Sequence, residues 1–163
     1  MNKIKNWVYH NRNYVLPHTF IRPFFRNFID KGYKNLVGAE VGIEYGTNLN
    51  SIIHNLPIKR IHAIDIDLSK CKRFDDLRIK FYEFDSFTAS NFIDNNSLDF
   101  CYIDSDHSYK HVVKEIPLYL DKVKLGGFFG GHDWNHKGVA KAVLEHFSID
   151  ELYLGGVDWW IVK

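Results

Sequence analysis

The sequence predicts an α/β fold, namely a doubly wound, mostly parallel sheet of seven strands that ends in an antiparallel hairpin at its edge. From residue 36 onward, short apolar runs alternate with stretches of helical periodicity. These runs read as strands that are buried on both faces, which is typical of a parallel sheet covered by helices. The last two runs lie so close together that only a tight turn fits between them, which indicates an antiparallel pair.

Five apolar runs predict the parallel strands. They are Leu36–Val41, Ile61–Ile64, Lys80–Phe84, Leu98–Ile103 and Gly127–Gly131. Two further runs, Asp150–Leu154 and Asp158–Val162, are separated by Gly155, Gly156 and Val157 and predict the edge hairpin. The sequence shows no internal repeat and no low-complexity linker. We therefore expect one domain over residues 36–163, preceded by a helical appendage over residues 1–35.

The first 34 residues differ from the rest in charge. They carry seven basic side chains against the single acid Asp30, whereas residues 35–163 carry fourteen against nineteen. A basic and aromatic segment suits nucleic acid, an anionic surface or an anionic substrate. A packed helix is the alternative, because aromatic and apolar residues recur there at helical spacing. The recurring residues are Phe20, Phe24, Phe25, Phe28 and Ile29. This spacing predicts a helix over residues 22–31 that ends near Gly32.

Composition excludes several classes of protein. The chain has 163 residues, of which 45% are hydrophobic and 25% charged, as in ordinary globular domains. Cys71 and Cys101 lie far apart and form no CxxC pair, so we expect reduced thiols in a cytoplasmic protein. No apolar run approaches the ~20 residues of a membrane helix, so we expect neither a transmembrane segment nor a cleaved signal peptide.

Acidic side chains follow five successive strands of the predicted sheet. They are Glu40 and Glu44 at the end of the first strand, Asp65 and Asp67 after the second, Asp85 after the third, Asp104 and Asp106 after the fourth, and Asp133 after the fifth. In such a sheet, ligands bind beyond the carboxyl ends of the strands. Clustered carboxylates repel one another unless a ligand or metal compensates them, so the pattern predicts a binding site. Taken singly, Asp85 and Ser86 also suit a helix N-cap.

The loop after the first strand points to the kind of ligand. A dinucleotide loop of the form GxGxxG needs its middle glycine for the backbone to approach a pyrophosphate, and Glu44 stands at that position here. Glu40 and Glu44 instead suit a ligand with positive charge, while Gly42 and Gly46 still allow close backbone approach. S-adenosylmethionine has a sulfonium, an ammonium and no phosphate, and therefore fits better than NAD. Asp65 is placed to accept ribose hydroxyls in either cofactor.

Three strings of the sequence carry a resemblance to a known family. They are Ala39–Thr47, Ile103–Val112 with the following Glu115–Ile116, and Leu125–Trp134. In these strings the chain resembles the class I S-adenosylmethionine-dependent methyltransferases, and among them the small-molecule group of macrocin- and rhamnosyl-type O-methyltransferases. The resemblance covers most of residues 36–163, and its second string is the most specific. It implies a Rossmann-like fold with S-adenosylmethionine as cofactor.

The resemblance also implies a role for each matching position. It places Glu40, Gly42 and Gly46 around the methionine part of the cofactor, with Glu44 in the same loop. It places Asp65 on the ribose, and Asp85 and Ser86 at the adenine. Asp104 is expected beside the transferable methyl group, where it is both a cofactor contact and a catalytic candidate.

A divalent cation is a second implication of the resemblance. Related O-methyltransferases bind one through the acids that correspond to Asp104 and Asp133. Carboxylate ligands suit Mg²⁺, which lowers the pKa of a substrate hydroxyl and positions it. Many of these relatives carry a second Asp or Asn after the latter acid, where this chain has Trp134. Asn135 or Asp106 is then the candidate to take its place, and a site without metal is the other possibility.

Two histidines are candidates for the general base. His107 follows Asp104 closely and His132 directly precedes Asp133, and a neutral imidazole can remove a hydroxyl proton near neutral pH. His107 can alternatively orient Asp104 or cap the following helix. The pairs His107 with His111 and His132 with His136 also have a spacing that can bind zinc on a helix, but no third soft ligand is near in the sequence.

The expected partner is a small-molecule methyl acceptor, most simply a hydroxyl compound. A short chain leaves its acceptor pocket to the N-terminal segment, to the loops after the fourth and fifth strands, or to the second subunit of a homodimer. Nucleic acid is an alternative partner because of the basic N-terminal segment. The acids around Asp104 would repel a phosphate backbone, and the Asn/Asp-Pro-Pro-aromatic string of many base methyltransferases is missing. A non-catalytic S-adenosylmethionine-binding domain is the remaining alternative.

Overall fold

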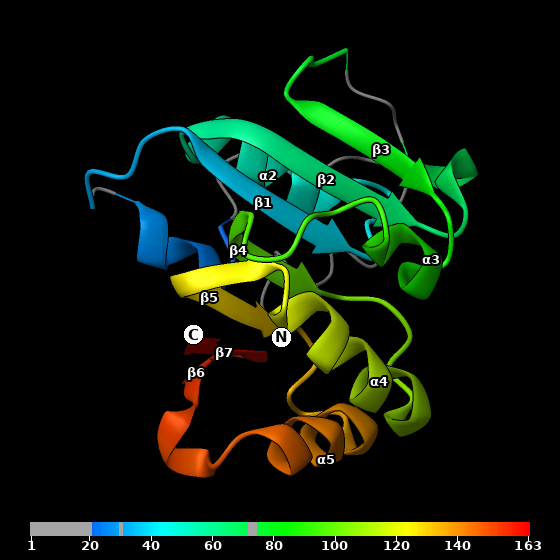
Figure 1. The fold of residues 1–163 in the computed structure, drawn as a ribbon, viewed down its shortest axis with the longest axis vertical. Helices are drawn as coiled ribbons and strands as arrows, with labels where there is room; N and C mark the ends of the chain where they lie inside the picture. Colours follow the sequence, from blue (N-terminus) through cyan, green and yellow to red (C-terminus); the bar gives the residue numbers. More distant parts are fainter. Residues whose placement is uncertain (1–20, 30, 72–74) are drawn as a thin grey trace, which may run out of the picture.

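Seven strands form one sheet in the computed structural model, which describes residues 21–29, 31–71 and 75–163. The strands are β1 (Leu36–Val41), β2 (Ile58–Asp65), β3 (Ile79–Glu83), β4 (Leu98–Ile103), β5 (Val123–Gly131), β6 (Tyr153–Gly155) and β7 (Asp158–Val162). Their order in the sheet is β3-β2-β1-β4-β5-β7-β6 (Figure 1). All neighbours up to β5 pair in parallel, and the pairs β5–β7 and β6–β7 are antiparallel. The predicted sheet, with its antiparallel hairpin at the edge, is confirmed.

Helices cover both faces of the sheet, as the doubly wound prediction requires (Figure 1). The helices are α2 (Thr47–Asn55), α3 (Ser86–Ser90), α4 (Tyr109–Leu120) and α5 (Lys137–His146), with short 3₁₀ turns at Pro23–Phe28, Leu68–Lys70 and Ile149–Glu151. One hydrophobic core packs the apolar sides of α3, α4 and α5 against the sheet, and the other packs α2 and the first 3₁₀ turn. No helix within the described ranges is long and apolar enough to cross a membrane.

Three strands differ in length from the prediction. Both β2 and β5 begin earlier, at Ile58 and Val123, because these residues pair with the neighbouring strands. Solvent-exposed residues interrupt the buried pattern in both, namely Lys59 and Arg60 in β2 and Leu125 and Gly126 in β5. In contrast, β6 begins only at Tyr153. Ser148 and Glu151 form a reciprocal capping box, which turns the chain into a 3₁₀ helix where the strand was expected to begin.

The N-terminal segment forms a shorter element than predicted. In place of a helix over residues 22–31, a 3₁₀ helix runs from Pro23 to Phe28, and Ile29 is already extended with φ −78° and ψ 133°. With three residues per turn, Phe25 and Phe28 lie on the same side of the element, which brings both rings into the core. The predicted apolar stripe is confirmed for the phenylalanines from 24 onward, whereas Phe20 lies outside the described residues.

These phenylalanines belong to the core beside the seven-stranded sheet and not to a separate layer. Phe24 and Phe25 lie with ring centroids 5.1 and 5.0 Å from Tyr102 of β4. Phe28 contacts Phe100 of the same strand at 5.2 Å. The backbone N–H of Phe24 donates to the buried carboxylate of Asp158 in β7 at 3.1 Å. The segment that follows Arg22 is therefore anchored to the central and C-terminal strands together.

Replacing Phe24 with alanine tests this anchoring. Its ring is fully buried against Phe25, Tyr102 and Trp160, so F24A should lower the free energy of unfolding by about 3–5 kcal/mol. Urea unfolding followed by tryptophan fluorescence measures this change. Leu77, with 94% of its surface exposed, is the matched control, and L77A should change stability by less than about 0.5 kcal/mol. Equal effects of the two variants would show that the segment is not part of the core.

Candidate active site

The candidate site lies where the strand order reverses, between the carboxyl ends of β1 and β4. Gly42 leaves β1 with φ +85°, and an added Cβ there would overlap the backbone carbonyl of Asp104. Only glycine lets the two chain segments approach this closely. The strands then diverge into loops, and this divergence opens the crevice in which doubly wound folds bind ligands.

The loop between β1 and α2 is held by Asp65 at the end of β2. Its Oδ2 accepts the backbone N–H groups of Ile43 and Glu44 at 3.0 and 2.8 Å, and its Oδ1 accepts that of Asp67. Glu44 is in the left-handed region at φ +43°, and Gly46 at φ +74° precedes the first residue of α2. The predicted ribose ligand Asp65 therefore lines the site and also organises the loop that forms its floor.

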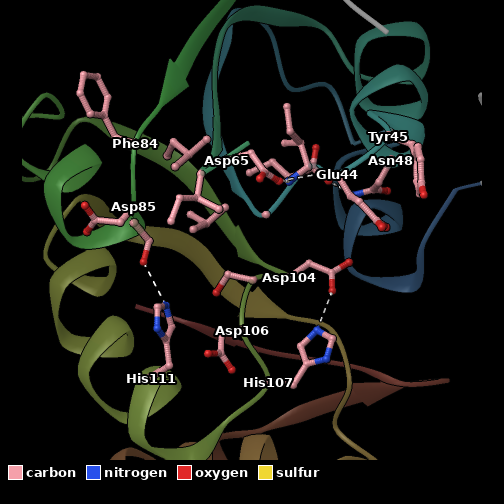
Figure 2. Close-up of a pocket in the computed structure, with 18 of the residues that line it drawn as sticks. Glu44, Tyr45, Asn48, Asp65, Phe84, Asp85, Asp104, Asp106, His107 and His111 are labelled. Atoms are coloured by element: carbon pink, nitrogen blue, oxygen red, sulfur yellow. Dashed lines mark hydrogen bonds and ion pairs between the residues drawn. The ribbon is translucent and has the colours of Figure 1, made fainter. Parts of the chain in front are cut away.

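A cavity of about 690 Å³ occupies this crevice, a volume typical of small-molecule sites. Figure 2 shows acidic side chains arranged around it, and the labelled Glu44, Asp65, Asp85 and Asp104 follow β1, β2, β3 and β4 in turn. Its polar lining includes Arg22, Glu40, Glu44, Asn48, Asp65, Asp85, Ser86, Asp104, Asp106, His107 and His111. Most sequence-predicted cofactor residues therefore come together in one cavity. Gly46, His132 and Asp133 lie outside its lining.

Glu40 is the most unusual of these acids because it is only 1% exposed. Its Oε1 accepts a hydrogen bond from the Asn48 side chain at 2.9 Å, but within the described structure Oε2 has no partner. Burial raises the pKa of Glu40 to about 8, although Asn48 and Arg22 oppose the shift. A buried carboxyl with one unsatisfied oxygen at the cavity wall is suited to a ligand that brings a positive donor.

Residues that follow β3 form a short hydrogen-bond network with α4 at the cavity wall. Asp85 caps α3 by accepting the Thr88 backbone N–H at 3.0 Å, which confirms its suitability as an N-cap. The Ser86 hydroxyl lies 3.1 Å from Nε2 of His111, which is in turn 3.3 Å from Oε1 of the fully buried Glu115. Neither His111 nor Glu115 was predicted to take part in this network.

A second cluster combines the ends of β4 and β5. Nε2 of His107 lies 3.0 Å from Asp133 Oδ2 and 3.6 Å from Asp104 Oδ1. Nδ1 of His132 lies 3.1 Å from Asp133 and 3.6 Å from Asp104. The Asp104 and Asp133 carboxylates raise the pKa of His107, and hydrogen bonding with His132 lowers the pKa of Asp133. The structure thus brings together all three predicted catalytic residues and both predicted metal ligands.

Three side chains of this cluster have the composition of a divalent-cation site. One ligand atom each from Asp104, His107 and Asp133 lies within 4.8 Å of the other two. Two carboxylates and an imidazole are donors that Mg²⁺ and Mn²⁺ accept, with water completing the coordination. Trp134 offers no such donor and packs against the core, and Asp106 accepts the Ser108 backbone N–H instead. The residues present therefore fit a cation held by two carboxylates.

Arg22 is a functional candidate that sequence reasoning missed. Its Nη2 lies 3.2 Å from Asp104 Oδ2, and its Nη1 is 3.9 Å from Asp158. Its guanidinium also lies over the ring of Tyr102 at 5.7 Å. Arg22 is the only lysine or arginine among the described residues that line the cavity. No local motif marks this residue, because its partners lie far along the chain.

The pair His107 and His111, considered for zinc, does not form a shared site. His107 turns toward Asp104 (Figure 2) and also faces Asp133. Nε2 of His111 instead lies near Ser86 and Glu115. The rings of His107 and His136 do approach, with centroids 5.9 Å apart. In the cluster at the ends of β4 and β5, the ring nitrogens of His107 and His132 face the carboxylates of Asp104 and Asp133, so oxygen-rich coordination describes this cluster better than a zinc site.

The burial of Glu40 predicts a specific pH dependence of stability. The pKa of Glu40 is raised from 4.5 to about 8 in the folded chain. Between these two pH values the folded chain still holds a proton that the unfolded chain has lost, so the free energy of unfolding falls as the pH rises. Glu40→Gln keeps the Oε1 acceptor for Asn48 but cannot ionise. E40Q should therefore raise the free energy of unfolding at pH 8 by about 1–3 kcal/mol, with little effect near pH 4.5. Urea titrations at both pH values measure the change, and a uniform or negative effect would contradict it.

A family model described as a methyltransferase domain matches residues 39–134, which is more than half of the chain. The matched region begins in β1 and ends directly after Asp133, so it contains both clusters. No curated protein matches this sequence.

Several solved structures share the fold. The MycE methyltransferase from the mycinamycin biosynthetic pathway, in complex with Mg, SAH and mycinamycin VI, superposes with a TM-score of 0.66 at 18% identity, covering 86% of this chain and 47% of that one. Spermidine synthase from Thermotoga maritima gives 0.58 at 17% identity, with coverages of 88% and 57%. A Klebsiella pneumoniae structure described as an O-methyltransferase gives 0.58 at 13%, with coverages of 78% and 73%.

This chain spans about half the length of the MycE structures, and at these identities the likeness concerns the fold. The family match over residues 39–134 rests on sequence and covers the strand ends that build the site. The predicted Rossmann-like fold agrees with these neighbours. The chain therefore belongs to the class I S-adenosylmethionine-dependent methyltransferase family.

Proposed function

We propose that this chain transfers a methyl group from S-adenosylmethionine to a hydroxyl of a small-molecule acceptor, with a divalent cation at Asp104 and Asp133. The observation that carries the proposal is the arrangement of two acidic groupings around one crevice. One contains the buried Glu40 with its unsatisfied oxygen, and the other is the Asp104–His107–Asp133 cluster. The first suits a cationic cofactor and the second suits activation of a hydroxyl.

The charge of the cavity favours S-adenosylmethionine over a dinucleotide. Among the described lining residues, six are Asp or Glu, and the guanidinium of Arg22 is already within 3.2 Å of Asp104. A pyrophosphate at the loop after β1 would face Glu44, and among the described residues the nearby cations Arg22 and Lys70 are already paired with Asp104 and Glu44. A ligand with an ammonium and a sulfonium instead gains from each of these acids.

The proposed cofactor roles are those that the family resemblance implies, and the cavity lining contains all of these residues except Gly46. Glu40, Gly42, Glu44 and Gly46 are the residues proposed to hold the methionine part, with Gly46 acting through the start of α2. Asp65 is proposed to bind the ribose, using lone pairs that remain beside its backbone contacts. Asp85 and Ser86 are proposed to bound the adenine, next to the exposed ring of Phe84. Asp104 then stands at the methyl-donating end.

The cation would be held by Asp104 and Asp133, with His107 beside it. When bound there, a cation would supply Lewis-acid chemistry that orients the acceptor hydroxyl and lowers its pKa, and S-adenosylmethionine would supply the electrophilic methyl group. Nε2 of His107 is the proposed site that accepts the hydroxyl proton, and Nδ1 of His132 is the alternative. Asp133 holds both imidazoles through its Oδ2 and so fixes their ring orientation.

The rest of the chain aligns the reactants and keeps water away. Methyl transfer is an in-line displacement, so the protein contributes mainly by positioning. Arg22 brings the N-terminal segment to the edge of the cavity, where that segment is proposed to cover the acceptor. A second subunit remains the alternative source of the acceptor wall.

Ligand-induced thermal stabilisation tests the choice of cofactor. S-adenosylmethionine and S-adenosylhomocysteine should each stabilise the folded chain by about 2.7 kcal/mol at a hundredfold excess over Kd, whereas NAD should not. Differential scanning fluorimetry with each ligand, with and without MgCl₂, measures this. Equal shifts with NAD, or no shift with either methionine derivative, would overturn the proposed cofactor.

Two substitutions separate cofactor binding from methyl transfer. Asp65→Ala removes both the ribose acceptor and the contact that holds the β1–α2 loop, so Kd for S-adenosylhomocysteine should rise about 10- to 100-fold. Asp104→Asn keeps the shape of the side chain and should leave that Kd within about threefold while turnover falls about 100-fold or more. Calorimetry and a methyl-transfer assay with a panel of hydroxyl acceptors measure the two quantities. The opposite assignment of effects would contradict the proposed roles.

The cation can be tested without a known acceptor. Isothermal titration with MnCl₂ should show one site in the wild-type chain, and Asp133→Asn should weaken it at least tenfold because one of two carboxylate ligands is lost. Asp121→Asn, at the end of α4 and outside the cluster, is the matched control and should not change the titration. Undiminished binding in D133N would place the cation elsewhere.

A further inference from the structure

Helix α4 connects two loops of the cavity through a buried charged pair that the proposed chemistry does not use. Glu115 is completely buried, and it lies one turn beyond His111 on the same face of the helix. Its Oε2 accepts the Ser105 hydroxyl at 2.7 Å, and its Oε1 is 3.3 Å from His111 Nε2. A buried carboxylate without compensation is strongly destabilising, so these two contacts account for its presence.

The other end of the pair reaches the loop between β3 and α3. The same Nε2 of His111 lies 3.1 Å from the Ser86 hydroxyl. Tyr119, two turns along α4 from His111, donates its hydroxyl to the Ser86 carbonyl oxygen at 2.7 Å. Ser86 is therefore held to α4 through both its side chain and its backbone. Ser105, at the end of β4, is held to the same helix by Glu115.

Both held serines line the cavity, and so does His111 itself. The side chain of His111 is 23% exposed and Glu115 is fully closed off, so the pair runs from the cavity wall into the core. Ser86 belongs to the part of the cavity assigned above to the adenine end. Weakening the contact between His111 and Glu115 therefore changes first the distance between the loop after β3, which carries Ser86, and the loop after β4, which carries Ser105.

We propose that His111 and Glu115 are positioning residues that fix the loops carrying Ser86 and Ser105, and thereby set the affinity of the site for the nucleoside half of its cofactor. This inference rests on the proposed cofactor. When the imidazole is charged, its Nε2–H donates to Glu115 and Ser86, and its positive charge balances the buried carboxylate. Deprotonation at Nδ1 keeps the Nε2–H donor but removes the counter-charge, which weakens the contact with Glu115 and loosens the two loops.

The surroundings of His111 favour the charged form. Hydrogen bonding to Glu115 is the main cause that raises the pKa of His111, and the charges of Glu115, Asp106 and Asp85 add to it. On the inner side, Glu115 faces the hydroxyl of Ser105 and, further away, the thiol of Cys101 and the hydroxyl of Tyr119. A pKa raised in the folded chain means that the contribution is complete below about pH 6.5 and is lost as pH rises through the raised value.

The test measures the Kd of S-adenosylhomocysteine by calorimetry between pH 6.0 and 9.0 for wild type and His111→Gln. H111Q should bind about tenfold more weakly at pH 6.0–6.5, and the ratio to wild type should approach one at pH 9.0. Ionisation of Glu40 near pH 8 affects both proteins alike, so it cancels in the ratio. His54→Gln is the matched control, because His54 lies on α2 outside the cavity lining, and its ratio should stay near one throughout.

Two further variants guard against simple loss of packing. Glu115→Gln should shift the pH at which cofactor affinity declines toward the ordinary histidine value of about 6.5, because His111 has lost its charged partner. The double variant H111Q/E115Q should bind more tightly than the two single effects predict, because an amide pair leaves no buried charge. Thermal unfolding without ligand confirms that each variant is folded.

Adenosine binding tests whether H111Q weakens the contacts with the nucleoside half of the cofactor. Its Kd, measured by ligand-observed NMR, should rise in H111Q by the same factor as that of S-adenosylhomocysteine. A pH-independent ratio for H111Q, unchanged affinity in H111Q at pH 6.0, or unchanged adenosine binding beside weakened S-adenosylhomocysteine binding would each overturn the inference. If the wild-type chain binds no S-adenosylhomocysteine, the proposed function itself fails, which is a distinct result.

Discussion

The backbone of Gly42 lies directly against the carbonyl group of Asp104, with no space between them for a side chain. Hydrogen bonds on both sides reinforce this approach, since Gly42 donates to Ile64 at 2.8 Å and Asp104 donates to Val41 at 2.7 Å. The end of β1 is thereby fixed between the ends of β2 and β4. Every other part of the site takes its position from this junction, including Glu40 before it, the loop held by Asp65 beyond it, and Asp104 across from it.

This junction brings acids together, and the chain stabilises them in different ways. Backbone N–H groups satisfy Asp65, and imidazoles accompany Asp133. Arg22 comes from a distant segment to reach Asp104. Glu40 receives only the Asn48 amide on one oxygen, so its pKa is raised, and it keeps unused capacity for a ligand. The carboxylates that hold loops or imidazoles in place therefore have hydrogen-bond partners, whereas one oxygen of Glu40 at the cavity wall has none among the described residues.

Most of the fold could be predicted from the apolar runs in the sequence. The errors of that prediction have local causes. The runs at β1, β4 and β7 were predicted with correct bounds, because each is a short apolar run flanked by turn residues. The predicted N-terminal helix was wrong in type and length, because burial of its phenylalanines is met by a 3₁₀ turn that ends at an extended Ile29. The capping box at Ser148 delays β6 for a reason that hydrophobicity alone does not report.

The site was predictable only where residues directly follow strands. Acids such as Asp104 and Asp133 meet because parallel strands end at one edge, which a linear pattern can foresee. Arg22 was missed because its contact with Asp104 spans 82 positions and a single arginine has no motif. Glu115 was missed although its spacing from Val112 and Ile116 places it on the buried face of α4. A charged residue at such a position is itself a signal that a buried partner exists.

The hydrogen bond from Phe24 to Asp158 joins the first described element to the last strand, across 134 positions of sequence. Arg22 reaches Asp104 from the same segment, and Asp158 lies on its other side. Contacts of such long sequence separation form late in folding, because they must offset the closure entropy of the intervening chain. During synthesis, the sheet up to β5 can assemble before β7 has emerged. Arg22 therefore makes both of its acidic contacts only after β7 has joined the sheet. The complete cavity wall then forms only when the whole sheet has folded.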